Sequence, residues 1–171
     1  MGPCMSMIPG APQLPTINFP GDDVASGIAT EVAKIPDALN AAESSLKTDY
    51  ATAKEKGEDL KVMGGKDNTV LLVTISKDLD DAELDKQIKS AARMQVAKGE
   101  FAEHAAEEVW TGVEPKIDEQ KPSNLAELNN PVMTGDQMWE KAKDKVHDQV
   151  VDQVKKKISD AVDNIVAQKQ E

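Results

Sequence analysis

The stretch "GDQMWEKAKDKVHDQVVDQVKKKISDAVDNIVAQKQE" (135–171) is the most regular part of this 171-residue chain. It contains no proline, and its only glycine stands at its start. Aliphatic side chains recur at intervals of four, four, four, three and four residues, at Val146, Val150, Val154, Ile158, Ala161 and Ile165. Because residues three or four apart share one face of a helix, this spacing predicts one long amphipathic helix.

Such a helix is long for a small globular protein, since about 30 helical residues span about 45 Å. A helix of this length usually packs along another helix or along a partner. We therefore predict that the aliphatic stripe, together with Trp139, is a partner-binding surface.

Residues 22–56 have a second helical pattern. Asp22 or Asp23 can cap its start, and apolar residues continue along one face at Val24, Ile28, Val32, Ile35, Leu39, Ala42, Leu46, Tyr50 and Ala53. Pro36 interrupts the pattern, so either one helix kinks there or a second helix begins. Gly57 is expected to end it.

The segment "DLKVMGGKDNTVLLVTIS" (59–76) predicts a β-hairpin. Its β-branched residues are dense after the turn-forming sequence "GGKDN". An isolated hairpin is marginal in water. This one is therefore expected to pack on the helices, to gain a third strand or to pair with another chain.

A further helical pattern follows the hairpin. Asp80 and Glu83 have the spacing of a capping box, and Leu84, Ile88 and Ala91 form an apolar face. Helix is expected to about residue 110, and a bend near Gly99 stays open. Residues 111–134 contain three prolines and no sustained periodicity, which predicts a linker. The expected fold is thus mainly α and bundle-like, with a helix–hairpin–helix core at 22–110.

The first 21 residues, "MGPCMSMIPGAPQLPTINFPG", contain five prolines and no charged side chain. Prolines at every third position match the period of polyproline II, and an aliphatic column runs beside them. An extended arm of this kind loses little entropy on docking into a groove. We predict partner binding through Met5, Ile8, Pro9, Ala11, Pro12, Leu14, Pro15 and Ile17. The alternative is a solvated tail whose spacing arises by chance.

The charge balance argues against nucleic-acid binding. The net charge is −11, the only arginine is Arg93, and the only basic run is the three lysines at 155–157. Phosphate backbones are bound by clustered Lys and Arg. The longest apolar run, "TVLLVTI" (69–75), is too short to span a bilayer. Without a signal-peptide pattern, we expect a cytoplasmic location or a place within a protein assembly.

No residue pattern predicts catalysis or a cofactor. Cys4 is the only cysteine, so neither an internal disulfide nor a cysteine-based zinc site can form. His104 and His147 each have acidic residues at helical spacing, but a di-metal bundle needs paired Glu-x-x-His motifs and two further glutamates. Solvated helix faces explain these histidines, and no nucleophile motif is present.

Together these patterns predict a non-enzymatic structural protein. We expect a component, scaffold or adaptor of a larger complex, such as a virion or a secretion-type particle, that binds a protein partner or itself through the arm and the C-terminal helix. The first alternative is an accessory protein that docks on a membrane or lipid surface through amphipathic helices. The second is a small helical enzyme or metal-binding protein.

Overall fold

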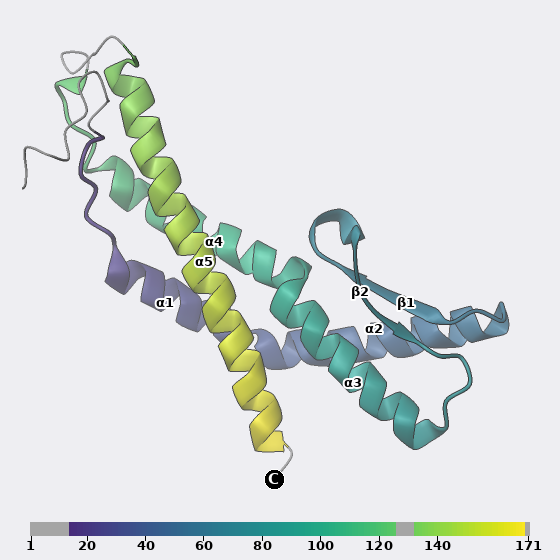
Figure 1. Ribbon diagram of the computed structural model, residues 1–171. Coiled ribbons are helices and arrows are strands. Elements are labelled where there is room, and N and C mark those ends of the chain that lie inside the picture. The colour runs from purple at the N-terminus through teal and green to yellow at the C-terminus, as the bar shows by residue number, and fades with distance from the viewer. Residues whose placement is uncertain (1–13, 126–131, 170–171) are drawn as a thin grey trace, which may run out of the picture.

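The computed structural model describes the backbone of residues 14–125 and 132–169 and the side chains up to Ile165. Figure 1 shows the arrangement of its helices and its one hairpin. The described helices are α1 (Gly21–Val32), α2 (Ile35–Glu55), α3 (Asp81–Lys98), α4 (Glu100–Asp118) and α5 (Gly135–Lys169). Strands β1 (Leu60–Gly64) and β2 (Val70–Ile75) flank the short 3₁₀ helix η2 (Lys66–Asn68). The predicted fold class, mainly helical with one β-hairpin and a long C-terminal amphipathic helix, is confirmed.

Helix α5 organises the larger of two apolar clusters, which we call the helical core. Its 35 residues span about 52 Å, and it contacts α1, α3 and α4. Its aliphatic stripe meets small side chains on α4, including Ala102, Ala105 and Ala106, all of which are buried. Small residues at this contact let the two helix axes approach closely.

The second cluster, which we call the hairpin core, lies between the hairpin and helices α2 and α3. The antiparallel strands β1 and β2 direct one face toward these helices. Its buried members are Leu46, Tyr50, Leu60, Val62, Ile75, Ile88, Ala91 and Ala92. Of the three ways in which the hairpin could be stabilised, the structure therefore shows packing on helices.

Pro36 marks the start of a new helix. Helix α1 ends at Val32, and Pro36 lies in the first turn of α2, where a missing N–H costs no intrahelical bond. The predicted cap of α1 by Asp22 or Asp23 is wrong, because Pro20 is its N-cap residue. The two aspartates lie in the first turn instead, where their negative charges interact favourably with the positive end of the helix dipole.

The prediction that Asp80 caps α3 is confirmed. The backbone N–H of Glu83 donates to the Asp80 carboxylate at 2.8 Å. Helix α3 then continues to Lys98, and Gly99 separates it from α4. The bend that the sequence left open is thus a complete break.

Gly99 is needed at this break because three backbone segments meet there. A Cβ atom at Gly99 would clash with the Gln95 carbonyl oxygen and would lie 3.4 Å from the Gly65 amide nitrogen in the hairpin turn. The end of α3 therefore excludes a side chain at this position, and the hairpin turn lies close beside it.

Helix α4 is longer than predicted. The predicted helix end near residue 110 is wrong, because α4 continues to Asp118. The first eight residues of the predicted linker at 111–134 are therefore helical. Val109, Val113 and Ile117 extend the buried face at intervals of four. Pro115 is exposed, so the carbonyl group that it leaves without an intrahelical N–H can be hydrated.

The first prediction tests whether the α5 stripe is core. Ile158 is fully buried, so Ile158→Ala should lower the free energy of unfolding by about 2–5 kcal/mol. Lys157→Ala, at the exposed neighbouring position, should change it by less than about 0.5 kcal/mol. Chemical denaturation followed by circular dichroism measures both values, and equal values for the two variants would contradict the observed packing.

The second prediction concerns the glycine at the α3–α4 junction. Gly99→Ala should destabilise the fold by about 2 kcal/mol or more, because the new methyl group meets the Gln95 carbonyl. Gly112→Ala is the matched control, since its Cβ would meet nothing within 4 Å. In mid-helix this change should stabilise the protein by about 0.5–1 kcal/mol. Thermal unfolding of the two variants should therefore shift in opposite directions.

Candidate interaction surface

The stripe predicted to bind a partner is the chain's own core. Trp139, Val150, Val154 and Ile158 are each at most 1% exposed, and Val146 is 7% exposed. Ala161 and Ile165 are half-buried and pack against the same helical core. Helices α1, α3 and α4 contact α5, so in this fold Trp139, Val150, Val154 and Ile158 are not accessible to a protein or lipid.

The described end of the N-terminal arm lies on the chain itself. Leu14 and Pro15 are half-buried, and Ile17 packs against the helical core. The Asn18 N–H donates to the Gln120 side-chain oxygen at 2.8 Å, and the Gln120 amide donates back to the Asn18 carbonyl at 3.0 Å. This part of the arm is thus held beside the end of α4. The other predicted arm contacts, at Met5, Ile8, Pro9, Ala11 and Pro12, lie outside the described residues.

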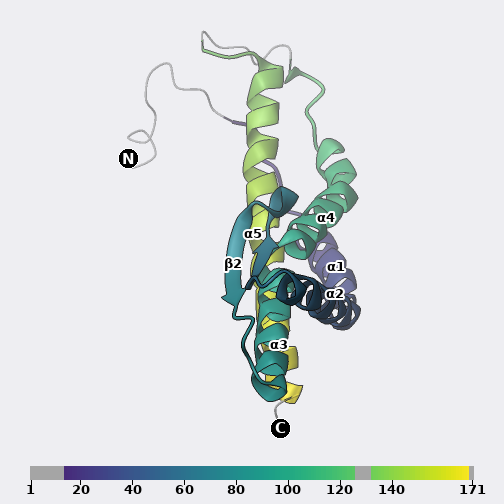
Figure 2. The same cartoon turned by 90° about the vertical axis from the view of Figure 1, so that its right-hand side faces the viewer.

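Among the described residues, the exposed large apolar side chains are Val132, which precedes α5 and is 61% exposed, and a neighbouring pair on the hairpin. Val70 and Leu71, at the start of β2, are each 53% exposed. The sheet has two strands in the part of the chain that the structure describes, so β2 has β1 on one side only. Figure 2 shows β2 at the outer margin of the molecule. An edge strand of this kind presents unpaired backbone N–H and C=O groups.

No charged residue interrupts this edge. Residues 69–76, "TVLLVTIS", contain no Asp, Glu, Lys, Arg or Pro, although 30% of the whole chain is charged. Edge strands are commonly protected by lysine, proline or a bulge, and of these β2 has only a bulge, at Leu72. Sequence reasoning predicted the strand but missed this surface, and the uncharged run was the signal that could have identified it.

The hairpin is held in place by polar contacts at both of its ends. The Gln95 amide donates to the Met63 carbonyl at 2.7 Å, close to the turn. At the open end, the Tyr50 hydroxyl donates to the Ser76 carbonyl at 3.0 Å, and the Lys77 N–H donates to Asp59 at 3.0 Å. These contacts hold the strands against α2 and α3, so the exposed edge has a defined position relative to the helices.

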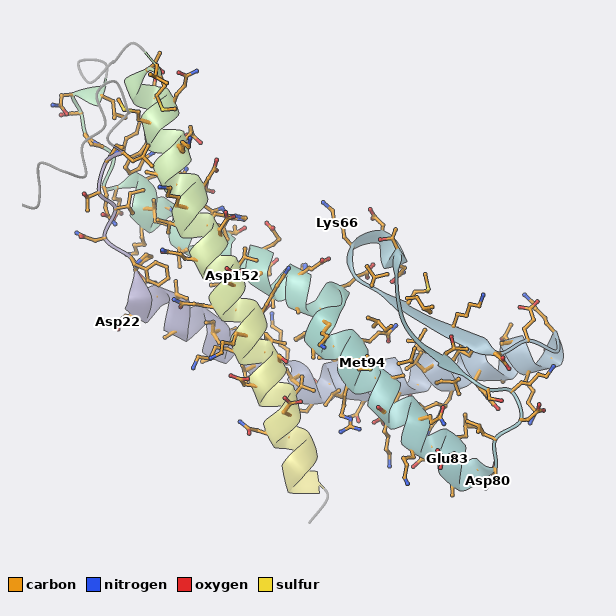
Figure 3. All side chains as sticks on the ribbon, in the orientation of Figure 1. Asp22, Lys66, Asp80, Glu83, Met94 and Asp152 are labelled. Carbon is orange, nitrogen blue, oxygen red and sulfur yellow. The ribbon has the colours of Figure 1, made fainter. Side chains whose placement is uncertain are left out.

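A cleft of about 470 Å³ lies between the hairpin turn and helices α4 and α5. Lys66, at the turn, projects away from the strands (Figure 3). The side chains that line the rest of the cleft are mainly charged or imidazole groups: Glu100, Glu103, His104, Glu107, His147 and Lys155, beside Ala106 and Val151. Within the described residues no group of three His, Cys, Asp or Glu side chains could hold a metal ion.

The two histidines of this cleft contact neighbouring side chains. His104 Nε2 lies 3.5 Å from Glu108 and His147 Nδ1 lies 3.3 Å from Asp148. The His147 ring meets Trp110 edge to face, with centroids 5.0 Å apart. Trp110 itself is half-buried and packs against the helical core. The contact of His147 with Trp110 joins α5 to α4 at the cleft, whereas the His104 contact lies within α4.

Lys143 forms a second polar contact between α4 and α5. Its ammonium group donates to Asp118 at 2.8 Å and to Glu114 at 3.0 Å, and its side chain is 11% exposed. Burial lowers the pKa of Lys143, but the hydrogen bonds to the two carboxylates outweigh this effect and raise the pKa above its ordinary value of 10.5. The charged form is therefore stabilised in the folded protein.

Comparison with known proteins gives no match: no family model, curated protein or solved structure matches this chain. Among the described helices, none is long and apolar enough to cross a membrane.

The third prediction follows from the Lys143 pKa. Lys143→Met keeps the aliphatic stem and removes both ion pairs, so it should cost about 1 kcal/mol of stability near neutral pH. Because the folded-state pKa is raised, this contribution is complete below the unfolded pKa of 10.5 and is lost as pH rises through the folded pKa. Urea unfolding of the native protein and the variant should thus converge once the pH exceeds the raised pKa of folded Lys143. The exposed Lys145→Met is the control, and a difference that persists at high pH would contradict the assignment.

Proposed function

We propose that this protein is a non-enzymatic structural component of a protein assembly and that β2 is its contact strand. The observation that carries the proposal is the uncharged edge of β2, on which Val70 and Leu71 are each 53% exposed. An extended segment of a partner would add a strand to this edge, with backbone hydrogen bonds supplying affinity and side-chain packing supplying specificity.

The rest of the described fold supports the choice of this surface. The α5 stripe and Ile17 are occupied by the chain's own core. Among the described residues, Val132 is the one other large apolar side chain that is exposed, and it does not lie on a strand edge. The contacts of Tyr50 and Gln95 hold the hairpin against α2 and α3 before any partner binds. A preformed edge lowers the entropy lost on association.

A lipid-docking role has less support. An amphipathic helix that lies on a membrane exposes an apolar face to the acyl chains. In this fold the apolar face of α5 is buried, including Val150, Val154 and Ile158 at 0% exposure. The proposed partner is therefore a protein strand.

The fourth prediction is a site-specific cross-link. A photoreactive phenylalanine analogue at Leu71 should yield adducts with a partner chain when full-length protein is irradiated in the cells that produce it. The same analogue at Asp22, an exposed position on α1 labelled in Figure 3, is the matched control. Mass spectrometry identifies the attached chain. Equal adduct yields at both positions, or none at Leu71, would contradict the proposal.

A further inference from the structure

The two faces of β2 carry an unusual pattern that follows from a bulge. Val62 pairs with Val73 and Met63 pairs with Leu71, so Leu72 is an extra residue that the ladder skips. Cross-strand partners lie on the same face of a sheet. A bulge of this kind changes which residues of the strand face the helices.

The inward face of β2 can be assigned residue by residue. Ile75 is buried, and Val73 pairs with the buried Val62, so both face the helices. Val70 pairs with Gly64, which is two residues from Val62 and therefore on its face. The Leu72 side chain lies within 2.7 Å of the position of a Gly64 Cβ, so Leu72 faces inward too.

The remaining two residues face outward. Leu71 pairs with Met63, and Thr74 pairs with the exposed Lys61. From Val70 to Ile75 the order is thus in, out, in, in, out, in, which is the same when read from either end. The side chains of an ordinary strand alternate strictly between the two faces. Such a strand can pair with β2 only if it leaves one residue of β2 unpaired, as β1 leaves Leu72.

We propose that the partner of β2 is β2 of a second copy of this chain, paired antiparallel about a two-fold axis. This inference rests on the proposed function and names its partner. In the register that places Val70 opposite Ile75 of the second copy, each of the six residues pairs with a residue whose side chain lies on the same face of the sheet. The product is a four-stranded sheet with the order β1-β2-β2-β1, and its interface is isologous.

This register also covers the apolar surface that the monomer leaves exposed. Val70 lies on the inward face but near the turn, where it is 53% exposed. Opposite Ile75 of the second copy, it would approach that copy's hairpin core. Leu71 would lie opposite Thr74 on the outer face. Two-fold symmetry repeats each contact, so all four exposed side chains gain a neighbour.

Charge is compatible with self-pairing at this edge. Each copy has a net charge of −11, yet residues 69–76 carry none, so the paired segments bring no like charges together. Strands β1 and β2 with their turn carry two lysines and one aspartate, a net charge of 2 − 1 = +1. By contrast, α4 carries six acids and one lysine, a net charge of 1 − 6 = −5. Contact through the hairpin thus keeps the most acidic helix out of the interface.

A six-residue edge buries less area than a stable dimer needs. We therefore expect a weak dimer, with a dissociation constant of about 10–500 µM. Sedimentation velocity of the full-length protein over this concentration range should show a monomer–dimer equilibrium. High local concentration, as inside an assembly, would shift this equilibrium toward the paired form.

The fifth prediction tests the surface by substitution. Leu71→Lys or Thr74→Lys should weaken the dimer at least about tenfold, because each substitution places a charged side chain on the paired edge, where lysine commonly blocks strand addition. Both side chains are exposed, so the monomer should keep its circular dichroism spectrum and its melting temperature. Ala51→Lys, at an exposed position on α2, should leave the dimer unchanged. A dimer that survives both strand substitutions overturns the proposal.

A disulfide experiment tests the register. In a Cys4→Ser background, the double variant Leu71→Cys/Thr74→Cys should form a covalent dimer under mild oxidation. In the proposed register, the cysteine that replaces Leu71 in one copy lies directly opposite the cysteine that replaces Thr74 in the other. Directly opposed residues are about 4.5–5.5 Å apart between Cα atoms, within disulfide reach. Each single variant should cross-link far less, since no cysteine then has a partner directly opposite.

The outcomes separate this inference from the function on which it rests. Concentration-dependent dimers with the double-cysteine cross-link support the second copy. If the purified chain stays monomeric at about 500 µM while the photoreactive residue at Leu71 captures a different protein, the second copy is wrong and the assembly function stands. If Leu71 captures nothing and the chain is monomeric, both are wrong.

Discussion

The burial of the α5 stripe is the constraint on which the rest of the fold depends. A helix of 35 residues with an aliphatic face along most of its length cannot be covered by one short helix. In this chain α1, α3 and α4 share the task, and each contacts α5. The chain turns between these helices at Lys34, before Pro36, and at Gly99.

The junction of α3 and α4 is also where the hairpin is held. The turn of the hairpin lies close to Gly99, and the Gln95 amide donates to the Met63 carbonyl there. The inner faces of the strands are then used by the hairpin core, whereas the edge of β2 stays outside it. The same packing that stabilises the hairpin therefore exposes the edge.

Much of this fold was predictable because its signals are local. The spacing of the α5 stripe, the Asp80 cap and the turn sequence between the strands act within a few residues, and the structure confirms each. The continuation of α4 past residue 110 was missed because Pro115 suggested an end, although Val113 and Ile117 kept the helical interval. In that case tertiary burial outweighs the local cost of proline.

The role of the apolar stripe was not predictable from periodicity, since periodicity shows that a face is apolar and not what covers it. The covering helix α1 is far from α5 in sequence, and the small residues that α4 places at the contact are ordinary alanines. The edge of β2 differs from the α5 stripe, because it consists of backbone groups. In the sequence it is indicated only by the lack of charged residues over 69–76. A bulge at one residue, visible only in the pairing of the strands, then gives that edge a pattern that its own copy can match. In this chain side-chain burial builds the fold, and the backbone edge that it leaves exposed is the contact that we propose for assembly.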